Sequence, residues 1–200
     1  MAAPTSTTSR FLAVARVLIG VIAALWLVEI IDALFLDHAL ERQGIQPRSW
    51  GGLDGILLAP FLHDDYAHLI SNTIPLAVLG ALVLLRGIPR WLQVTAFVII
   101  VGGFATWLLA RSANHIGASG VVFGYLGFLL AAGFFERSVR AIALGAITAL
   151  AYGGLLWGVL PTRPGISWES HLFGFAAGAL AASWLLSRPA ATVWPSRHRS

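Results

Sequence analysis

Six long apolar runs constrain this chain more than any other feature of its sequence. Each run holds close to the ~20 residues that an α-helix needs to cross the hydrocarbon core of a bilayer. Hydrophobic residues make up 58% of the 200 residues and charged residues only 11%, against about 25% charged in an average soluble domain. The sequence therefore predicts an integral membrane protein with no separate soluble domain.

We predict an all-α membrane fold in which six transmembrane helices form one bundle. The predicted helices cover residues 11–36, 67–85, 91–110, 116–135, 141–160 and 168–186. They form one domain, 11–187, between an N-terminal tail of 1–10 and a C-terminal tail of 188–200. The first loop, about 37–66, is the long connection. The first run exceeds a signal-peptide core and has no convincing cleavage site, so we interpret it as a retained helix.

The arginines predict which way the bundle faces. Nine arginines fall on the side of the termini and four on the other side, so the positive-inside rule places both termini in the cytoplasm. Because the arginines occur singly or in pairs at helix ends, they indicate membrane orientation and not nucleic-acid binding. The chain has no cysteine, which excludes disulfides, thiolate nucleophiles and cysteine metal sites.

Polar residues that are costly in a bilayer gather at one predicted depth. The second, fourth and sixth helices begin at the outer face, and their first turns carry His68 and Asn72, then Ser119, then His171. Ionisable residues in a bilayer tend to face a bundle interior or a water-filled cavity. Taken singly, each has a structural explanation, the serine as a packing residue and the histidines as interhelical hydrogen-bonding groups.

Small residues allow these helices to meet. Glycines recur at three- and four-residue spacing on the fourth and sixth helices: Gly117, Gly120, Gly124, Gly127, Gly174 and Gly178. Such faces let two helix backbones approach closely. His171 shares its helix face with Gly174 and Gly178, so a close contact with the fourth helix brings His171 toward Ser119.

Together the polar groups supply what acyl transfer needs. Ser119 is a candidate nucleophile, His171 is a base that takes its proton, and His68 and Asn72 are donors for an oxyanion. Ser119 also lies near a helix N-terminus, where free N–H groups and the positive dipole end favour an oxyanion. We expect no cofactor and no metal, because the histidines and acidic residues at 63–68 lack an HExxH pattern.

These motifs resemble those of the rhomboid intramembrane serine proteases, over about residues 44–186. The family's GxSG motif stands here as GASG at 117–120, its HxxxN motif as HLISN at 68–72, and its last-helix histidine as His171. One departure is Phe123, where some rhomboids carry a tyrosine stacked on the catalytic histidine. We expect the phenyl ring to pack against the imidazole and activity to survive.

The resemblance implies an endopeptidase that cleaves transmembrane segments of other proteins with a Ser119–His171 dyad. It implies that the oxyanion is held by the Ser119 N–H with the side chains of His68 and Asn72, while Gly117 keeps the loop around the serine open. The expected location is a bacterial plasma membrane, with the active site open to the extracytoplasmic side. The resemblance also suggests that substrates enter sideways, past the second and fifth helices.

Other readings of the sequence stay open. A catalytically silent rhomboid-like protein that escorts membrane clients keeps the fold without needing a nucleophile, and a small transporter spreads its polar groups through the bilayer. Glu169 points to another helix face than His171, which favours a dyad over a triad. Glu29 and Asp32, near the outer end of the first helix, are predicted to reach the membrane interface.

Overall fold

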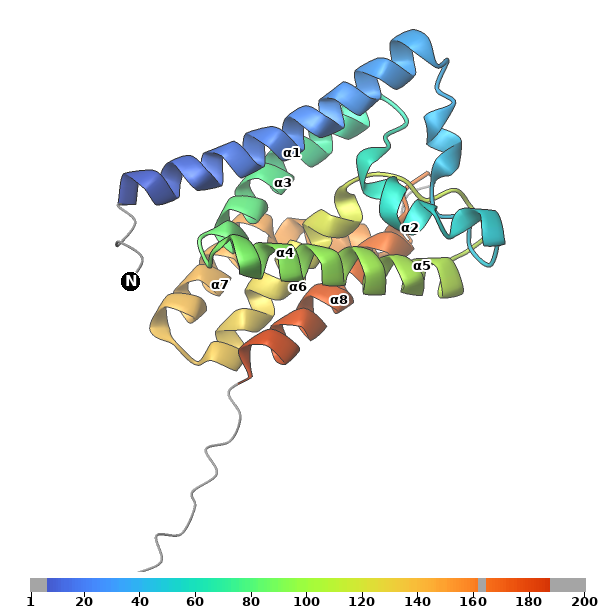
Figure 1. Cartoon of the computed structure of the whole chain (residues 1–200). Coiled ribbons are helices and arrows are strands. Elements are labelled where there is room, and N and C mark those ends of the chain that lie inside the picture. The colour runs from blue at the N-terminus through green and yellow to red at the C-terminus, as the bar shows by residue number, and fades with distance from the viewer. Residues whose placement is uncertain (1–6, 162–164, 188–200) are drawn as a thin grey trace, which may run out of the picture.

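A bundle of helices makes up the part of the chain that the computed structural model describes, residues 7–161 and 165–187 (Figure 1). The longer helices are α1 (Thr7–Phe35), α3 (Tyr66–Leu84), α4 (Ile88–Phe97), α5 (Gly103–Leu109), α6 (Ser119–Glu136), α7 (Val139–Tyr152) and α8 (Trp168–Leu186). The shorter helical turns are η1 (Leu40–Gln43), η2 (Trp50–Gly52), α2 (Gly55–Leu58), η3 (Ala59–Phe61), η4 (Val98–Gly102) and η5 (Gly153–Val159). All regular elements within these ranges are helical, as predicted. The predicted C-terminal tail of 188–200 lies outside the described residues.

Five described helical segments are long and apolar enough to cross a membrane. They are Phe11–Phe35, Tyr66–Leu84, Ile88–Leu109, Ser119–Glu136 and Val139–Val159. The third joins α4, η4 and α5 into one rod, and the fifth joins α7 to η5. The sixth predicted segment is also a helix, α8, but its first turn carries Glu169 and His171 and so makes it less apolar. The crossing by α8 therefore stays a prediction.

Large apolar side chains cover the outside of the bundle. Examples that are more than half exposed are Leu27, Leu34, Leu109, Phe134, Ile147, Leu150 and Trp184. A soluble protein rarely exposes so much contiguous apolar surface, whereas lipid tails are its natural solvent. The exposed surface thus agrees with the predicted membrane location.

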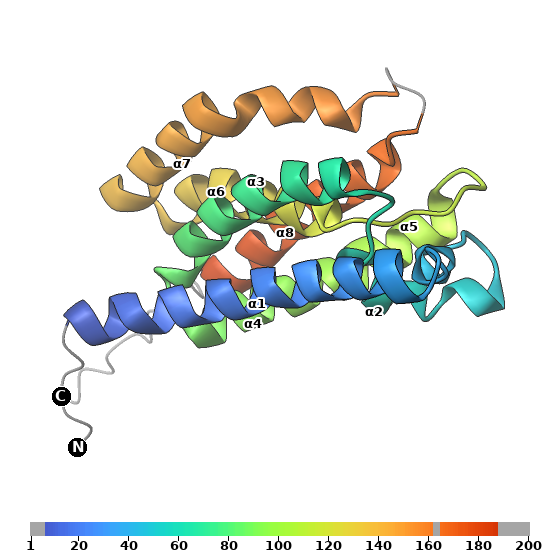
Figure 2. The same cartoon turned by 90° about the horizontal axis from the view of Figure 1, so that it is seen from above.

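The central helix is α6. Its contact with α8 is the most extensive in the bundle, and it also packs on α7, α3 and η4. In Figure 2, α1 and α7 lie on opposite sides of the group formed by α3, α6 and α8. Tyr125, Leu126, Phe128 and Leu129 of α6 are fully buried in the core. The start of α6, with Ser119, is therefore held between other helices and not at the lipid-facing surface.

Glycines make the contact between α6 and α8 close. Gly174 lies against the carbonyl oxygen of Gly120, and Gly178 lies against that of Gly124. A Cβ at either position on α8 would overlap the facing backbone, and Gly127 meets the α8 backbone in the same way. Only glycine permits this approach, and the close contact that the glycine spacing predicts is present.

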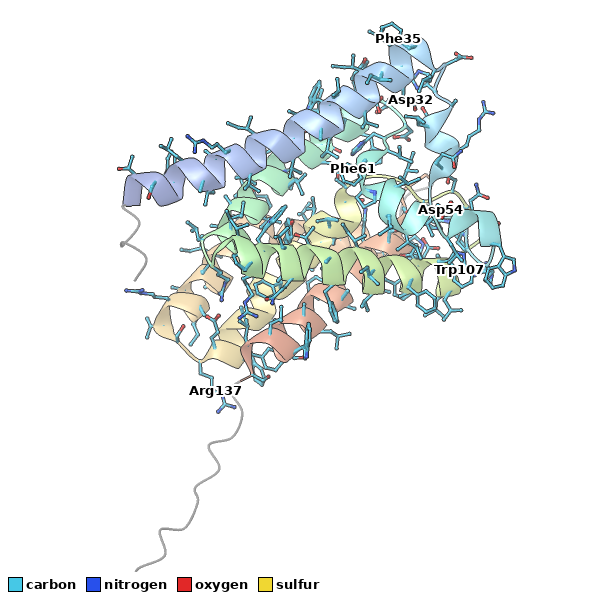
Figure 3. The ribbon with its side chains drawn as sticks, viewed as in Figure 1. Asp32, Phe35, Asp54, Phe61, Trp107 and Arg137 are labelled. Atoms are coloured by element: carbon cyan, nitrogen blue, oxygen red, sulfur yellow. The ribbon has the colours of Figure 1, made fainter. Side chains whose placement is uncertain are left out.

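The two ends of the bundle carry different charges. Figure 3 shows Arg137 at one end and Asp32, Asp54 and Trp107 at the other. Figures 1 and 2 place the first turn of α1 and the last turn of α8 at the end that carries Arg137. Both described chain ends therefore lie on one side, opposite the long connection between α1 and α3.

The structure adds two details that the sequence analysis did not contain. The side chains of Glu29 and Asp32 are packed inside the protein, only 2% and 3% exposed, and their position relative to the membrane interface stays a prediction. The fourth long helix begins at Ser119 and not at residue 116, because Gly117 takes a φ of +109° that no α-helix contains. Both details depend on contacts with the segment between α1 and α3, and the spacing of apolar residues in the sequence does not predict these contacts.

Candidate active site

Ser119 is the first residue of α6, and the segment before it is pinned by backbone bonds. The Gly117 N–H donates to the Ala59 carbonyl at 2.9 Å, and Ile45 pairs with His115 through two backbone bonds of 3.0 Å. Gly117 then turns the chain with a positive φ that favours glycine. The first N–H groups of a helix have no helical carbonyl to bond, so the N–H groups of Ser119 and Gly120 have no partner within α6.

The structure brings Ser119 and His171 together from α6 and α8. Ser119 Oγ lies 2.8 Å from His171 Nε2, within hydrogen-bond distance. The other ring nitrogen, Nδ1, lies 2.9 Å from the Gly158 carbonyl oxygen. A carbonyl only accepts, so Nδ1 carries the proton and Nε2 of the neutral ring has its lone pair free. The imidazole is thus in the tautomer that accepts the serine proton.

Phe123 holds the plane of the His171 ring. Their centroids are 4.2 Å apart and their planes differ by 6°, which is a close parallel stack. Phe123 is buried, one turn along α6 from Ser119. A Cβ added to Gly158 would lie 2.9 Å from the Phe123 ring tip and 3.3 Å from His171 Nδ1, so no spare room surrounds the stack. The predicted packing of Phe123 on the histidine is present.

His68 reaches the same site from the first turn of α3. A Cβ at Gly117 would stand only 2.6 Å from His68 Nε2 and 3.7 Å from Ser119 Oγ, so the ring lies over the glycine beside the serine. Its Nδ1 lies 2.5 Å from an Asp64 carboxylate oxygen, and the Asp65 carboxylate caps the helix by accepting from the His68 N–H at 2.6 Å. These bonds direct Nε2 toward Gly117.

Asn72 is buried on α3, but its side-chain amide is occupied. Nδ2 donates to the His68 carbonyl oxygen, one turn earlier, at 3.0 Å. The sequence predicted a free donor for an oxyanion. Asn72 serves in that role only if this amide exchanges its bond to the backbone for one to the substrate.

Sequence reasoning missed two buried histidines beside the site. His63 Nε2 accepts a hydrogen bond from the Ala118 N–H at 3.4 Å, which requires an unprotonated nitrogen. Burial and the neighbouring His68 lower the pKa of His63 to about 4, so the ring is neutral at neutral pH. Because Nε2 accepts from the Ala118 N–H, the one proton of the neutral ring lies on Nδ1. The five-residue spacing from His68 was the available signal, but it does not predict a contact with the chain before Ser119.

His115 connects the segment that precedes α6 with the residue that precedes α8. Its Nδ1 hydrogen bonds to the Ser167 hydroxyl, and its Nε2 lies 3.2 Å from the Arg111 carbonyl. Burial lowers the pKa of His115 as well. Glu169 completes this connection with an ion pair to Arg111 at 3.4 Å, so its carboxylate is engaged away from His171. Nothing in the sequence pattern marked His115 for this position.

A small cavity adjoins the serine. Its volume is about 40 Å³, and its lining includes Gly117, Gly120, His115, Thr106 and Ser170. One buried water needs roughly 10–15 Å³ of such space and two to four polar partners, so the cavity has room for a few waters. Water can therefore be held next to the candidate nucleophile within the bundle.

The chain is similar to several known proteins. The Rhomboid domain family model matches residues 50–189. An uncharacterised protein of Mycobacterium tuberculosis is 41% identical over 198 residues, which cover 93% of this chain and 82% of that relative. One from Mycobacterium leprae is 46% identical over 176 residues, which cover 84% of this chain and 69% of that relative. RHOMBOID-like protein 4 of Arabidopsis thaliana is 28% identical over 141 residues, 67% of this chain and 34% of its own length.

Proposed function

The chain belongs to the rhomboid family, and we propose that it is an intramembrane serine endopeptidase that cleaves transmembrane segments of other membrane proteins. The observation that carries the proposal is the 2.8 Å approach of Ser119 Oγ to His171 Nε2, with His171 Nδ1 held by the Gly158 carbonyl. A packing serine has no need of a histidine in a defined tautomer. A nucleophile does.

In the proposed mechanism Ser119 Oγ attacks the scissile carbonyl carbon while its proton passes to His171 Nε2. The Gly158 carbonyl then faces a positively charged ring, which its negative oxygen end stabilises. His171 returns the proton to the leaving amine, and a water from the adjoining cavity hydrolyses the acyl-enzyme. Two side chains suffice for these steps, since the Glu169 carboxylate is paired with Arg111.

The negative oxygen of the tetrahedral intermediate needs donors. The proposal assigns this role to the Ser119 N–H at the helix N-terminus, to His68 and to Asn72. His68 Nδ1 faces the Asp64 carboxylate, so Nε2 carries a proton for donation when the ring is in its doubly protonated form. Asp64 then pairs with the positive ring and acts as a positioning residue.

The proposed location is the plasma membrane of a bacterium, with both termini cytoplasmic and the site open to the outer side. The nine arginines on the side of the termini support this orientation, as does Arg137 at the end opposite Asp32 and Asp54 (Figure 3). The dyad lies in the first turns of α6 and α8, close to the segment between α1 and α3. A substrate strand therefore needs to unwind near the outer surface and not at the bilayer centre.

The test is covalent labelling combined with cleavage. Purified protein in detergent is treated with a fluorophosphonate probe and with a fluorogenic transmembrane peptide. We expect labelling and cleavage for the wild type and for Ser183→Ala, which removes a hydroxyl near the other end of α8 that donates to the Leu180 carbonyl. Ser119→Ala should lose both signals, and Asn72→Ala should lower kcat by about 10².

The rival function is a silent rhomboid-like protein that binds and escorts membrane clients. It predicts a folded wild-type protein that neither reacts with the probe nor cleaves the peptide. A Ser119→Ala protein that cleaves at the wild-type rate would overturn the dyad altogether. Unchanged turnover in Asn72→Ala would remove that amide from the oxyanion site only.

A further inference from the structure

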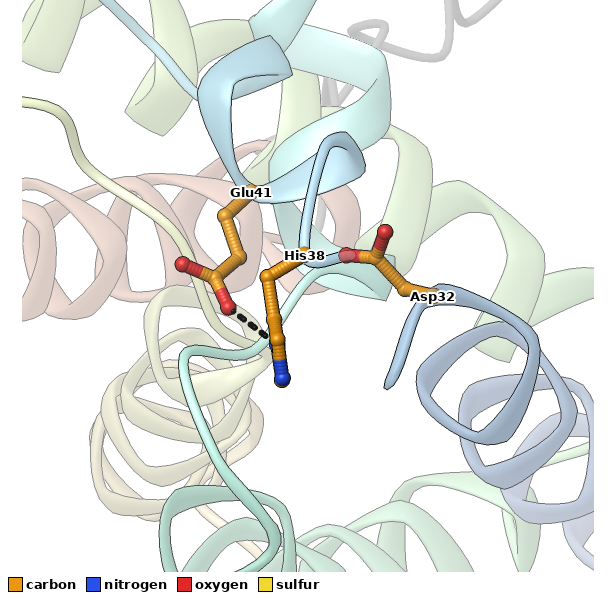
Figure 4. A group of neighbouring side chains, drawn as sticks. All are labelled: Asp32, His38 and Glu41. Atoms are coloured by element: carbon orange, nitrogen blue, oxygen red, sulfur yellow. Dashed lines mark ion pairs between the residues drawn. The ribbon is translucent and has the colours of Figure 1, made fainter. Parts of the chain in front are cut away.

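Three potential metal ligands meet where α1 gives way to the first loop. Asp32, His38 and Glu41, here called the outer cluster, each offer one ligand atom, and these atoms all lie within 4.8 Å of one another. Figure 4 shows the three side chains, with His38 Nδ1 paired to a Glu41 carboxylate oxygen at 2.7 Å. Asp32 is buried, whereas the side chains of His38 and Glu41 are 46% and 26% exposed. The cluster is thus anchored on one side and open to solution on the other.

A third acidic side chain, that of Glu29, is buried next to the outer cluster. Glu29 lies one turn before Asp32 on the same face of α1, is 2% exposed, and its Oε1 has no hydrogen-bond partner among the described residues. Asp32, His38, Glu41 and Asp64 all act electrostatically on its carboxyl group, and His38 is the basic residue among these four. A buried carboxyl group either keeps a proton or needs a positive charge nearby, and a cation at the outer cluster would supply that charge.

The donor set selects the type of cation. Imidazole together with carboxylates suits zinc and similar transition metals, whereas calcium takes six to eight oxygen ligands. Three protein ligands and a water complete an open zinc site. With bonds of about 2.1 Å, two zinc ligands stand roughly 3.5 Å apart, so the cluster needs inward shifts of about 1 Å. Two of its members are partly exposed side chains that can make such shifts.

We propose that the outer cluster binds one divalent transition-metal cation of the zinc type, with Asp32, His38 and Glu41 as ligands. The cation joins the last turn of α1 to η1 and so fixes the first loop against the bundle. This site is separate from the dyad and does not depend on the proposed protease activity.

The experiment measures zinc binding to the full-length protein, purified without a histidine tag and stripped with a chelator. Equilibrium dialysis against Zn²⁺ is compared for the wild type, His38→Asn/Glu41→Gln and Asp37→Asn. The last is a matched control, since Asp37 is exposed, adjacent in the chain and outside the cluster. We expect one bound zinc per chain in the wild type and the control, and at least tenfold weaker binding in the double variant. Added zinc should raise the unfolding temperature of the wild type and of Asp37→Asn, but not that of the double variant.

The same measurements can refute the site. Equal zinc affinity in the double variant would place the metal elsewhere, for instance on His63 and His68, which that variant retains. Displacement of zinc by an equal concentration of calcium would overturn the assignment to an imidazole-ligated transition metal. A single His38→Asn protein, altered only at a half-exposed side chain, gives the same comparison if the double variant does not fold. No cleavage assay enters, so failure here leaves the proposed protease untouched.

Discussion

Replacing Phe123 by leucine tests whether the ring stack orients His171, the proposed catalytic base. The stack has a centroid distance of 4.2 Å and an interplanar angle of 6°, and such aromatic pairs contribute about 1 kcal/mol beyond their buried area. Losing that preference for one ring orientation lowers the fraction of His171 rings poised for proton transfer. A difference of about 1 kcal/mol is a factor of about 5, so kcat should fall about fivefold. A ring displaced by a full ångström would cost as much as 10².

The assay is steady-state cleavage of a fluorogenic transmembrane peptide, with kcat and KM resolved separately. Phe134→Leu makes the same chemical change on the same helix at a side chain that is 70% exposed and far from the stack. We expect kcat to fall only in Phe123→Leu, with KM unchanged in both. Thermal unfolding of the two variants shows whether a loss of folded protein contributes. A Phe123→Leu enzyme with wild-type kcat would refute the orienting role of the stack.

Three further changes probe other contacts. Gly174→Val forces a side chain into the Gly120 carbonyl, so it should separate α6 from α8 and abolish both cleavage and cooperative unfolding, as read by circular dichroism. Glu169→Gln should keep most of kcat, because the carboxylate pairs with Arg111 and not with His171; a loss of more than tenfold would argue for a triad. His63 has a folded pKa of about 4 against about 6.5 unfolded, so its contribution to stability is present above pH 6.5 and is lost as the pH falls to 4, by about 3 kcal/mol in all. A His63→Asn protein should lack that decline in the unfolding free energy, and equal pH profiles for the two proteins would contradict it.

The first loop shows where sequence reasoning stops. Asp37 and His38 both take positive φ, 51° and 57°, and so turn His38 back toward Asp32. Aspartate and histidine are among the non-glycine residues that adopt that conformation most often, but only a few per cent of them do so, so the residue types alone do not predict the turn. The outer cluster spans only ten residues of sequence, yet without the turn its members have no reason to meet. The same holds for His63, whose bond to the Ala118 N–H joins positions 55 residues apart in the chain.

The approach of Ser119 to His171 was predictable because it follows from helix register. Gly120 adjoins Ser119, Gly174 follows His171 by three residues, and the two glycines face each other across the interface. Glycine spacing alone therefore aligns Ser119 with His171, and a slip of one turn, about 5.4 Å, would separate the two side chains. The tautomer of His171 cannot be predicted from glycine spacing. It depends on the bond from Nδ1 to a backbone carbonyl in η5, and the apolar sequence of η5 does not indicate this bond. Periodic contacts can thus be read from a sequence, whereas contacts made by a loop carbonyl require the fold.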